Sequence, residues 1–134
     1  MIILSNSIAQ TVLPGQSLSF DTSILKTGCA ECHRIGSGAV NLSAKNSIYE
    51  IKFTGNIGAT AEGTAQLAIS AGGSPLNETT MISQTAAAGD LNNVGCDTAV
   101  KTCCNAYETI TVTNTGTTEL NIGSNPCLFI KRIA

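Results

Sequence analysis

Residues 47–55 read SIYEIKFTG, and this stretch carries the clearest structural signal in the chain. Its large apolar side chains recur at every second position, as Tyr49, Ile51 and Phe53, with charged or hydroxyl-bearing residues between them. Successive side chains of a β-strand point to opposite faces of the sheet, so a period of two buries one face and exposes the other. The stretch therefore predicts a strand with one face in a hydrophobic core.

The same alternation continues in both directions along the chain. It is clear in QTVLPGQSLSF (10–20), AQLAISAGGSPL (65–76), ETITVTNTG (108–116) and CLFIKRI (127–133), and weaker strands are predicted at 2–4, 39–43, 79–84 and 97–103. Gly, Pro, Asn and Ser mark the turns between these segments. TAAAGDLNN (85–93) is interpreted as a loop, because Gly89 interrupts it. The sequence predicts an all-β sandwich of about 8–10 antiparallel strands in one domain over 1–134.

Composition limits the partners of the protein. Charged residues make up 12% of the 134 residues, about half of the roughly 25% that is usual. The formal net charge is −2 and no run of Lys or Arg occurs, so nucleic acid is not an expected partner. No apolar segment approaches the roughly 20 residues that cross a bilayer, so membrane insertion is not expected. MIILSNSIAQ (1–10) lacks the basic region of a signal peptide, so we expect synthesis in the cytoplasm.

The order of these segments resembles the jelly roll of the tumour-necrosis-factor and complement proteins. It resembles still more the head domains of bacterial collagen-like spore filaments and phage fibres. The resemblance lies in VLPGQSLSFDTSILKTG (12–28), AKNSIYEIKFTGNI (44–57), LAISAGGSPL (67–76), ETITVTNTGTTELNI (108–122) and CLFIKRIA (127–134). It covers nearly the whole chain and implies a jelly-roll sandwich that assembles as a compact trimer around a threefold axis.

Composition gives a separate reason to expect a homotrimer. The chain has three Phe, two Tyr and no Trp, so a sandwich of this length has few large side chains for a core of its own. Packing one face against neighbouring copies would bury more apolar surface, about 800 Å² per partner in an interface of standard size. In this interpretation the core or the trimer interface contains Tyr49, Ile51, Phe53, Leu128 and Ile130.

Cys29-x-x-Cys32-His33, within TGCAECHRIG (27–36), has the spacing by which haem is attached in c-type cytochromes. The context argues against haem c. Attachment takes place outside the cytoplasm, His33 is the only histidine, and an aromatic-poor chain offers little for a haem pocket. Haem c therefore remains an alternative, with His33 as an axial ligand.

Other interpretations of the six cysteines stay open. Cys29, Cys32, Cys103 and Cys104, with His33 as a substitute ligand, could form a tetrahedral zinc site if 103–104 lie in a loop. Alternatively, Cys29 or Cys32 forms a disulfide with Cys103 or Cys104, and closing a loop of about 70 residues would stabilise the fold by roughly 4 kcal/mol. We favour at least one disulfide over zinc and over plain buried thiols, and we expect no cofactor.

No set of residues predicts catalysis. The single histidine has no Ser and Asp arranged around it as a triad, and no glycine-rich phosphate loop occurs, so the chain is not expected to be an enzyme. Polar loops predicted at 58–64 and 87–93 are where a host carbohydrate or receptor could bind. The leading hypothesis is a trimeric structural and binding knob on the virion, as a head fibre or capsid decoration that contacts other virion proteins. The alternatives are a spore- or cell-surface domain of the same fold and a small haem c electron carrier.

Overall fold

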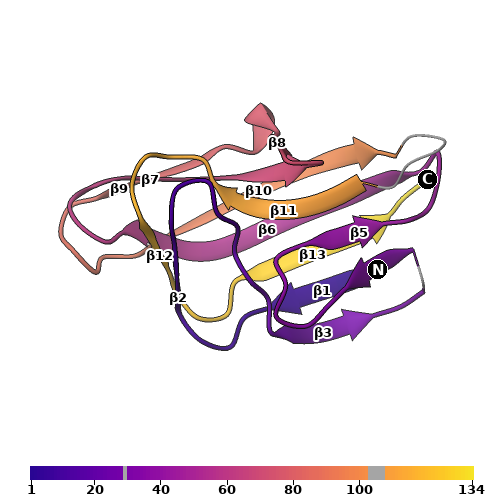
Figure 1. Cartoon of the computed structure of the whole chain (residues 1–134), viewed down its shortest axis with the longest axis horizontal. Coiled ribbons are helices and arrows are strands. Elements are labelled where there is room, and N and C mark those ends of the chain that lie inside the picture. The colour runs from indigo at the N-terminus through magenta and orange to yellow at the C-terminus, as the bar shows by residue number, and fades with distance from the viewer. Residues whose placement is uncertain (29, 103–107) are drawn as a thin grey trace.

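The computed structural model describes residues 1–28, 30–102 and 108–134, which form two antiparallel β-sheets around one core (Figure 1). We name the seven-stranded sheet sheet A and the six-stranded sheet sheet B. The strands of sheet A are β1 (Ile2–Ser5), β2 (Gln10–Val12), β3 (Thr22–Lys26), β6 (Ile48–Ala59), β10 (Asn92–Lys101), β12 (Leu120–Ile122) and β13 (Cys127–Arg132). The strands of sheet B are β4 (Glu31–His33), β5 (Val40–Leu42), β7 (Gly63–Ala71), β8 (Ser74–Pro75), β9 (Met81–Thr85) and β11 (Glu108–Asn114). A 3-10 turn, η1 (Asn77–Thr79), links β8 to β9.

The long strand β6 organises sheet A. The order across the sheet is β2-β12-β6-β13-β1-β3, and β10 pairs with the other edge of β6. In sheet B the order is β4-β5-β11-β7-β8, and β9 also pairs with β7. Every pair is antiparallel, which confirms the predicted all-β sandwich.

The alternation in 47–55 has the expected structural result. Tyr49, Ile51 and Phe53 have no exposed surface, while Lys52 and Thr54 between them are exposed. Leu128 and Ile130 of β13 lie opposite Phe53 and Ile51 in register and are equally buried. The structure therefore places these five residues in the chain's own core, rather than at a surface that another copy could reach. The core is continuous and mainly aliphatic, with Phe20, Tyr49 and Phe53 as its aromatic members.

The structure contains more strands than the sequence predicted. The strand β4 was missed, since 29–32 was expected to lie in a connection. The strands β3 and β8 lie within 12–28 and 65–76, where strands were expected without bounds, and all residues of β3 are exposed. A strand that is exposed on both faces leaves no period-two apolar pattern to detect. The predicted loop at 85–93 was too long, because β10 begins at Asn92. In the described ranges no helix is long and apolar enough to cross a membrane.

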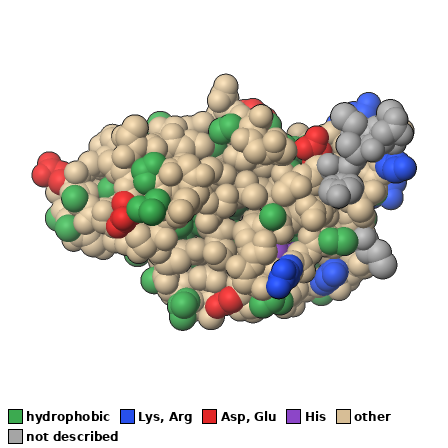
Figure 2. Space-filling model, in the orientation of Figure 1, with side chains coloured by type: hydrophobic (Ala, Val, Ile, Leu, Met, Phe, Trp, Pro, Cys, Tyr) green, Lys and Arg blue, Asp and Glu red, His purple; other side chains and the backbone are tan. Residues whose placement is uncertain are grey.

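Both termini lie at one end of the sandwich, at the right in Figure 1. The Met1 ammonium donates a hydrogen bond to the Thr27 carbonyl at 2.9 Å, and the Ile133 N–H donates to the Ile48 carbonyl at 2.8 Å. Lys and Arg side chains gather towards this end, whereas charged groups are sparse over the rest of the face shown in Figure 2.

Candidate functional site

The outer face of sheet A has a shallow hollow of about 260 Å³, lined by Lys52, Thr54, Cys127 and Phe129. The strand register brings these four side chains together, since Cys127 pairs with Thr54 and Phe129 pairs with Lys52. Phe53 and Leu128, the next residues along the same two strands, point the other way and fill the core. The outward-facing residues of β6 and β13 therefore line the hollow, whereas the inward-facing residues of the same two strands fill the core.

An apolar row extends from this hollow towards the edge of sheet A. Phe129 of β13 pairs with Ile3 of β1, and Ile3 pairs with Leu25 of β3. These three outward side chains are partly exposed, Leu25 to 38%. The register between β1 and β3 shifts after this pair, so Ile24 has no partner on β1. Ile24 lies at the sheet edge and is 61% exposed. We call Phe129, Ile3 and Leu25 the outer apolar row.

One charged group covers part of the row. The Lys52 ammonium lies 5.7 Å from the centroid of the Phe129 ring, within the range of a cation–π contact. The same ammonium is 3.5 Å from Glu50 Oε1. Both charged side chains are substantially exposed, so this ion pair contributes little to stability. Lys52 and the Phe129 ring that it approaches both line the hollow.

Sequence reasoning missed the outer apolar row, although a signal for it was present. In CLFIKRI the alternation that buries Leu128 and Ile130 assigns Phe129 to the opposite face. A phenylalanine at an outward position of a central strand is an indication of a contact surface. The contribution of Ile3 and Leu25 could not be found without the pairing of β1 and β3.

Two of the six cysteines are protonated thiols within sheet A. Burial raises the pKa of Cys96 on β10 to about 11, and burial also raises the pKa of Cys127. A thiol needs its thiolate form to act as a nucleophile or metal ligand, so neither residue is suited to those roles at neutral pH.

The predicted cysteine site lies partly outside the described residues. Cys29, Cys103 and Cys104 fall there, so the disulfide and zinc hypotheses stay predictions. Cys32 is exposed on β4, where it pairs in register with Asn41. Within 1–28, 30–102 and 108–134, no three His, Cys, Asp or Glu side chains gather as a metal site.

His33 has a structural environment at the end of β4. Its Nε2 is 2.8 Å from the Ser37 carbonyl, and its ring meets Phe20 edge to face with centroids 6.5 Å apart. Metal or haem ligation through Nε2 would break this hydrogen bond. The neighbouring Glu31 is only 2% exposed, and its Oε1 lies 3.1 Å from the Met1 ammonium. Sequence analysis gave no sign that this carboxylate is buried.

Comparison with known proteins agrees with the fold. No model of a known protein family and no curated protein sequence matches the chain. Among solved structures, the globular domain of zebrafish complement 1qA protein is similar with a TM-score of 0.56 and 8% identity, over 96% of this chain and 94% of that one. Murine APRIL is similar with a TM-score of 0.52 and 11% identity, over 92% of this chain and 98% of that one. The chain has the tumour-necrosis-factor and complement type of jelly-roll fold.

The predicted fold resemblance is thereby confirmed. A weaker likeness, to the PRD1 vertex protein P5, has a TM-score of 0.47 and 13% identity, over 92% of each chain. At such low identities the two stronger similarities establish the jelly roll alone, and the function has to be inferred from the surfaces of this chain.

Proposed function

We propose that this chain is a non-enzymatic structural and binding protein that works as a homotrimer, displayed as a knob on a bacteriophage particle. The observation that carries the trimer is the outer apolar row. Phe129, Ile3 and Leu25 face solvent across three adjacent strands, while their inward neighbours already fill the core. Contiguous exposed apolar surface on a soluble protein marks an interaction site.

The position of the row suits association of identical copies. A threefold ring uses a heterologous interface, in which one patch of each copy meets a different patch of the next. Sheet A offers two such patches side by side: the hollow beside Phe129, and the sheet edge with the exposed Ile24. In this arrangement the β3 edge of one copy packs against the Phe129 hollow of its neighbour. The resemblance of the sequence to trimeric jelly-roll heads supports the same assembly.

A structural role fits the chemistry of the described residues. The thiols of Cys96 and Cys127 are held protonated, and the His33 imidazole is engaged by the Ser37 carbonyl. The location on a phage particle is supported by the resemblance of AKNSIYEIKFTGNI (44–57) and the accompanying segments to phage-fibre heads. Contacts with other virion proteins and with a host surface follow from that location.

Native mass spectrometry tests the trimer. We expect a species of three times the 13.7 kDa chain mass, which dissociates in Phe129→Ser. Buried aromatic residues at the centre of an interface typically contribute 2 kcal/mol or more, so the dissociation constant should rise by about thirtyfold or more. The matched control is Ile82→Ser, which removes an aliphatic side chain that is 58% exposed on sheet B. This control should leave the trimer intact.

A single-chain mass for the unaltered protein at micromolar concentration would contradict the trimer. Equal effects of the Phe129 and Ile82 substitutions would contradict the assignment of its interface. The particle location is tested separately by the genes beside this one: capsid and fibre genes would support it, and sporulation genes would favour a spore-surface domain.

A further inference from the structure

A second hollow lies where β2 and β12 meet the connection between β9 and β10. It has a volume of about 320 Å³ and is open to solvent. This volume is at the lower end of the range for small-molecule sites. Its lining includes Thr11, Asn121, Gly89 and Leu91, and no charged side chain contributes to it. We infer that this hollow binds an uncharged saccharide, one terminal sugar residue of a glycan.

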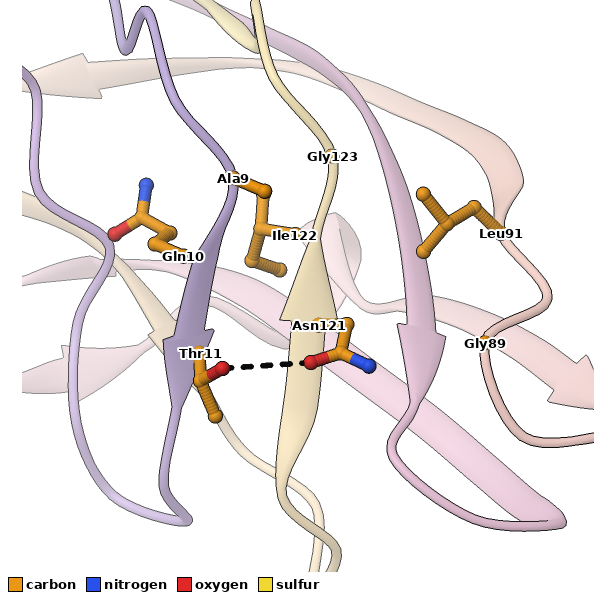
Figure 3. A pocket seen from close by; sticks show the side chains of 8 residues that line it. All are labelled: Ala9, Gln10, Thr11, Gly89, Leu91, Asn121, Ile122 and Gly123. Carbon is orange, nitrogen blue, oxygen red and sulfur yellow. Dashed lines mark hydrogen bonds between the residues drawn. The ribbon is translucent and has the colours of Figure 1, made fainter.

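The polar side of the hollow presents the Asn121 carboxamide beside the Thr11 hydroxyl. The Thr11 hydroxyl donates to Asn121 Oδ1 at 3.4 Å across the β2–β12 pair. The Asn121 amide nitrogen points away from Thr11 (Figure 3). Within the described part of the chain, that nitrogen has no acceptor. A carboxamide can offer a donor and an acceptor together, as a sugar hydroxyl pair requires.

The apolar side of the hollow is formed by Leu91, whose position is fixed by two glycines. A Cβ at Gly123 would lie 3.1 Å from Leu91 Cδ1. A Cβ at Gly58 would lie 1.9 Å from the Asp90 carbonyl oxygen and 3.3 Å from Leu91 Cδ2. The absence of side chains at both positions lets the connection approach β6 and β12 closely. Leu91 is nevertheless 43% exposed, so part of it remains available to the hollow.

The wall formed by β2 is also held in place. The Gln10 carboxamide clamps the Ser19 backbone, donating to its carbonyl at 3.0 Å and accepting from its N–H at 2.9 Å. The backbone of β2 pairs with β12 over three residues. A site with fixed walls loses little conformational entropy when a ligand binds.

These features match the chemistry of a neutral sugar. A pyranose ring has hydroxyl groups at its edge and C–H groups on its faces, so it needs hydrogen-bonding groups beside an apolar contact. The hollow supplies the first through Asn121 and Thr11 and the second through Leu91. A charged ligand would find no counter-ion in the lining. The inference gives the proposed display function a ligand class, and it rests on that function only for its biological purpose.

A nitrogen–proton correlation NMR titration of the full chain tests the site. The probes are the methyl glycosides of mannose, galactose and N-acetylglucosamine at millimolar concentrations. We expect at least one to shift the backbone amides of Gly89, Leu91, Asn121 and Gly123 together with the Asn121 side-chain amide. Absence of shifts with all three probes, or shifts confined to another part of the molecule, would overturn the inference.

Two variants establish which groups bind. Asn121→Ala should weaken binding by about threefold to tenfold, the range expected for one hydrogen bond. The matched control is Asn41→Ala, because Asn41 also lies in the middle of a three-residue strand and accepts a hydrogen bond from a threonine, Thr109, at 2.8 Å. Binding that is unchanged in Asn121→Ala, or equal binding of a methyl glucuronide, would overturn the assignment. The titration does not depend on the native mass, so the site and the trimer can fail independently.

Discussion

The outer faces of the two sheets differ in whether their side chains find partners within the same chain. On sheet A, Phe129, Ile3 and Leu25 form an apolar row with no covering element from the described part of the chain. On sheet B, the outward side chains around β11 are mainly hydroxyls that bond to one another. Thr113 Oγ1 is the centre of this network, at 3.3 Å from Ser17 Oγ, 3.1 Å from Ser70 Oγ and 3.1 Å from Thr111 Oγ1.

This difference shows which face is complete within one chain. The hydroxyls around β11 find partners on neighbouring segments, so this part of sheet B needs no further contact. Apolar side chains cannot be satisfied in this way, and only removal from water stabilises them. A shared fold therefore gives one face suited to solvent and one suited to association.

The largest expected effect separates the two sides of β13. Leu128→Ala removes a side chain with no exposed surface and should lower the free energy of unfolding by about 2–5 kcal/mol. Phe129→Ala removes its partly exposed neighbour and should cost an isolated chain less than about 1 kcal/mol. Urea unfolding at several protein concentrations measures both, since association makes the apparent stability depend on concentration. A large, concentration-independent cost for Phe129→Ala would show that the outer row belongs to the chain's own core.

The next effect tests whether sheet B is complete by itself. Thr113→Val keeps the shape of the side chain but removes the hydroxyl that Ser70 bonds to. Ser70 is only 1% exposed, so its hydroxyl would be left buried without that acceptor. The free energy of unfolding should fall by about 1–3 kcal/mol, with no change in native mass. Thr64→Val is the control, because Thr64 is exposed and bonds only at the surface, to Gln84. Dissociation of the trimer by Thr113→Val would refute the contrast between the faces.

The inward and outward faces of the long strands could be predicted from the sequence. ETITVTNTG (108–116) places threonines on one face of β11 and Ile110 and Val112 on the other, and the structure agrees. SIYEIKFTG (47–55) likewise predicted the inward face of β6. These strands are long and buried on one side, so a period of two is easy to detect.

What the sequence could not provide is the pairing of strands far apart in the chain. The outer apolar row joins β13 to β1 and β3, and the second hollow joins β2, β12 and the β9–β10 connection. No local pattern encodes such neighbours. Residues 87–93 were predicted as a possible binding loop, and the structure brings Gly89 and Leu91 beside Asn121. The loop was a reasonable expectation, whereas Asn121 was not singled out.

A smaller effect concerns thiol reactivity on sheet A. Cys127 lies in the Phe129 hollow with a raised pKa, so iodoacetamide should modify it slowly at neutral pH. Its rate should fall further as protein concentration rises, because the proposed trimer would cover the hollow. Cys96, whose pKa is about 11, should also react slowly, but at a rate independent of concentration. Peptide-resolved mass spectrometry distinguishes the two sites. A Cys127 rate that ignores protein concentration, alongside an intact trimer, would place the interface elsewhere.

The smallest effect is a pH dependence at the edge of sheet A. Asp21 precedes β3, and its carboxylate accepts hydrogen bonds from the Ser7 hydroxyl at 2.7 Å, the Thr22 hydroxyl at 2.7 Å and the Ser7 N–H at 2.8 Å. These donors, the Ser7 hydroxyl first, lower the pKa of Asp21 below its ordinary value of 3.8. Because the folded-state pKa is the lower one, the stabilisation is complete above the unfolded-state pKa. It is lost as the pH falls through the folded-state pKa.

Urea midpoints measured from neutral pH into the acid range should therefore fall less steeply for Asp21→Asn than for the unaltered chain. Ser7→Ala should shift the onset of the fall to higher pH, because it removes the donor that lowers the pKa most. The hydroxyl network around Thr113 contains no ionisable side chain, so the cost of Thr113→Val should be the same across this range. If Asp21→Asn leaves the acid-range slope unchanged, the carboxylate does not hold the β1–β2 connection against β3, and the open edge of sheet A is fixed by backbone pairing alone.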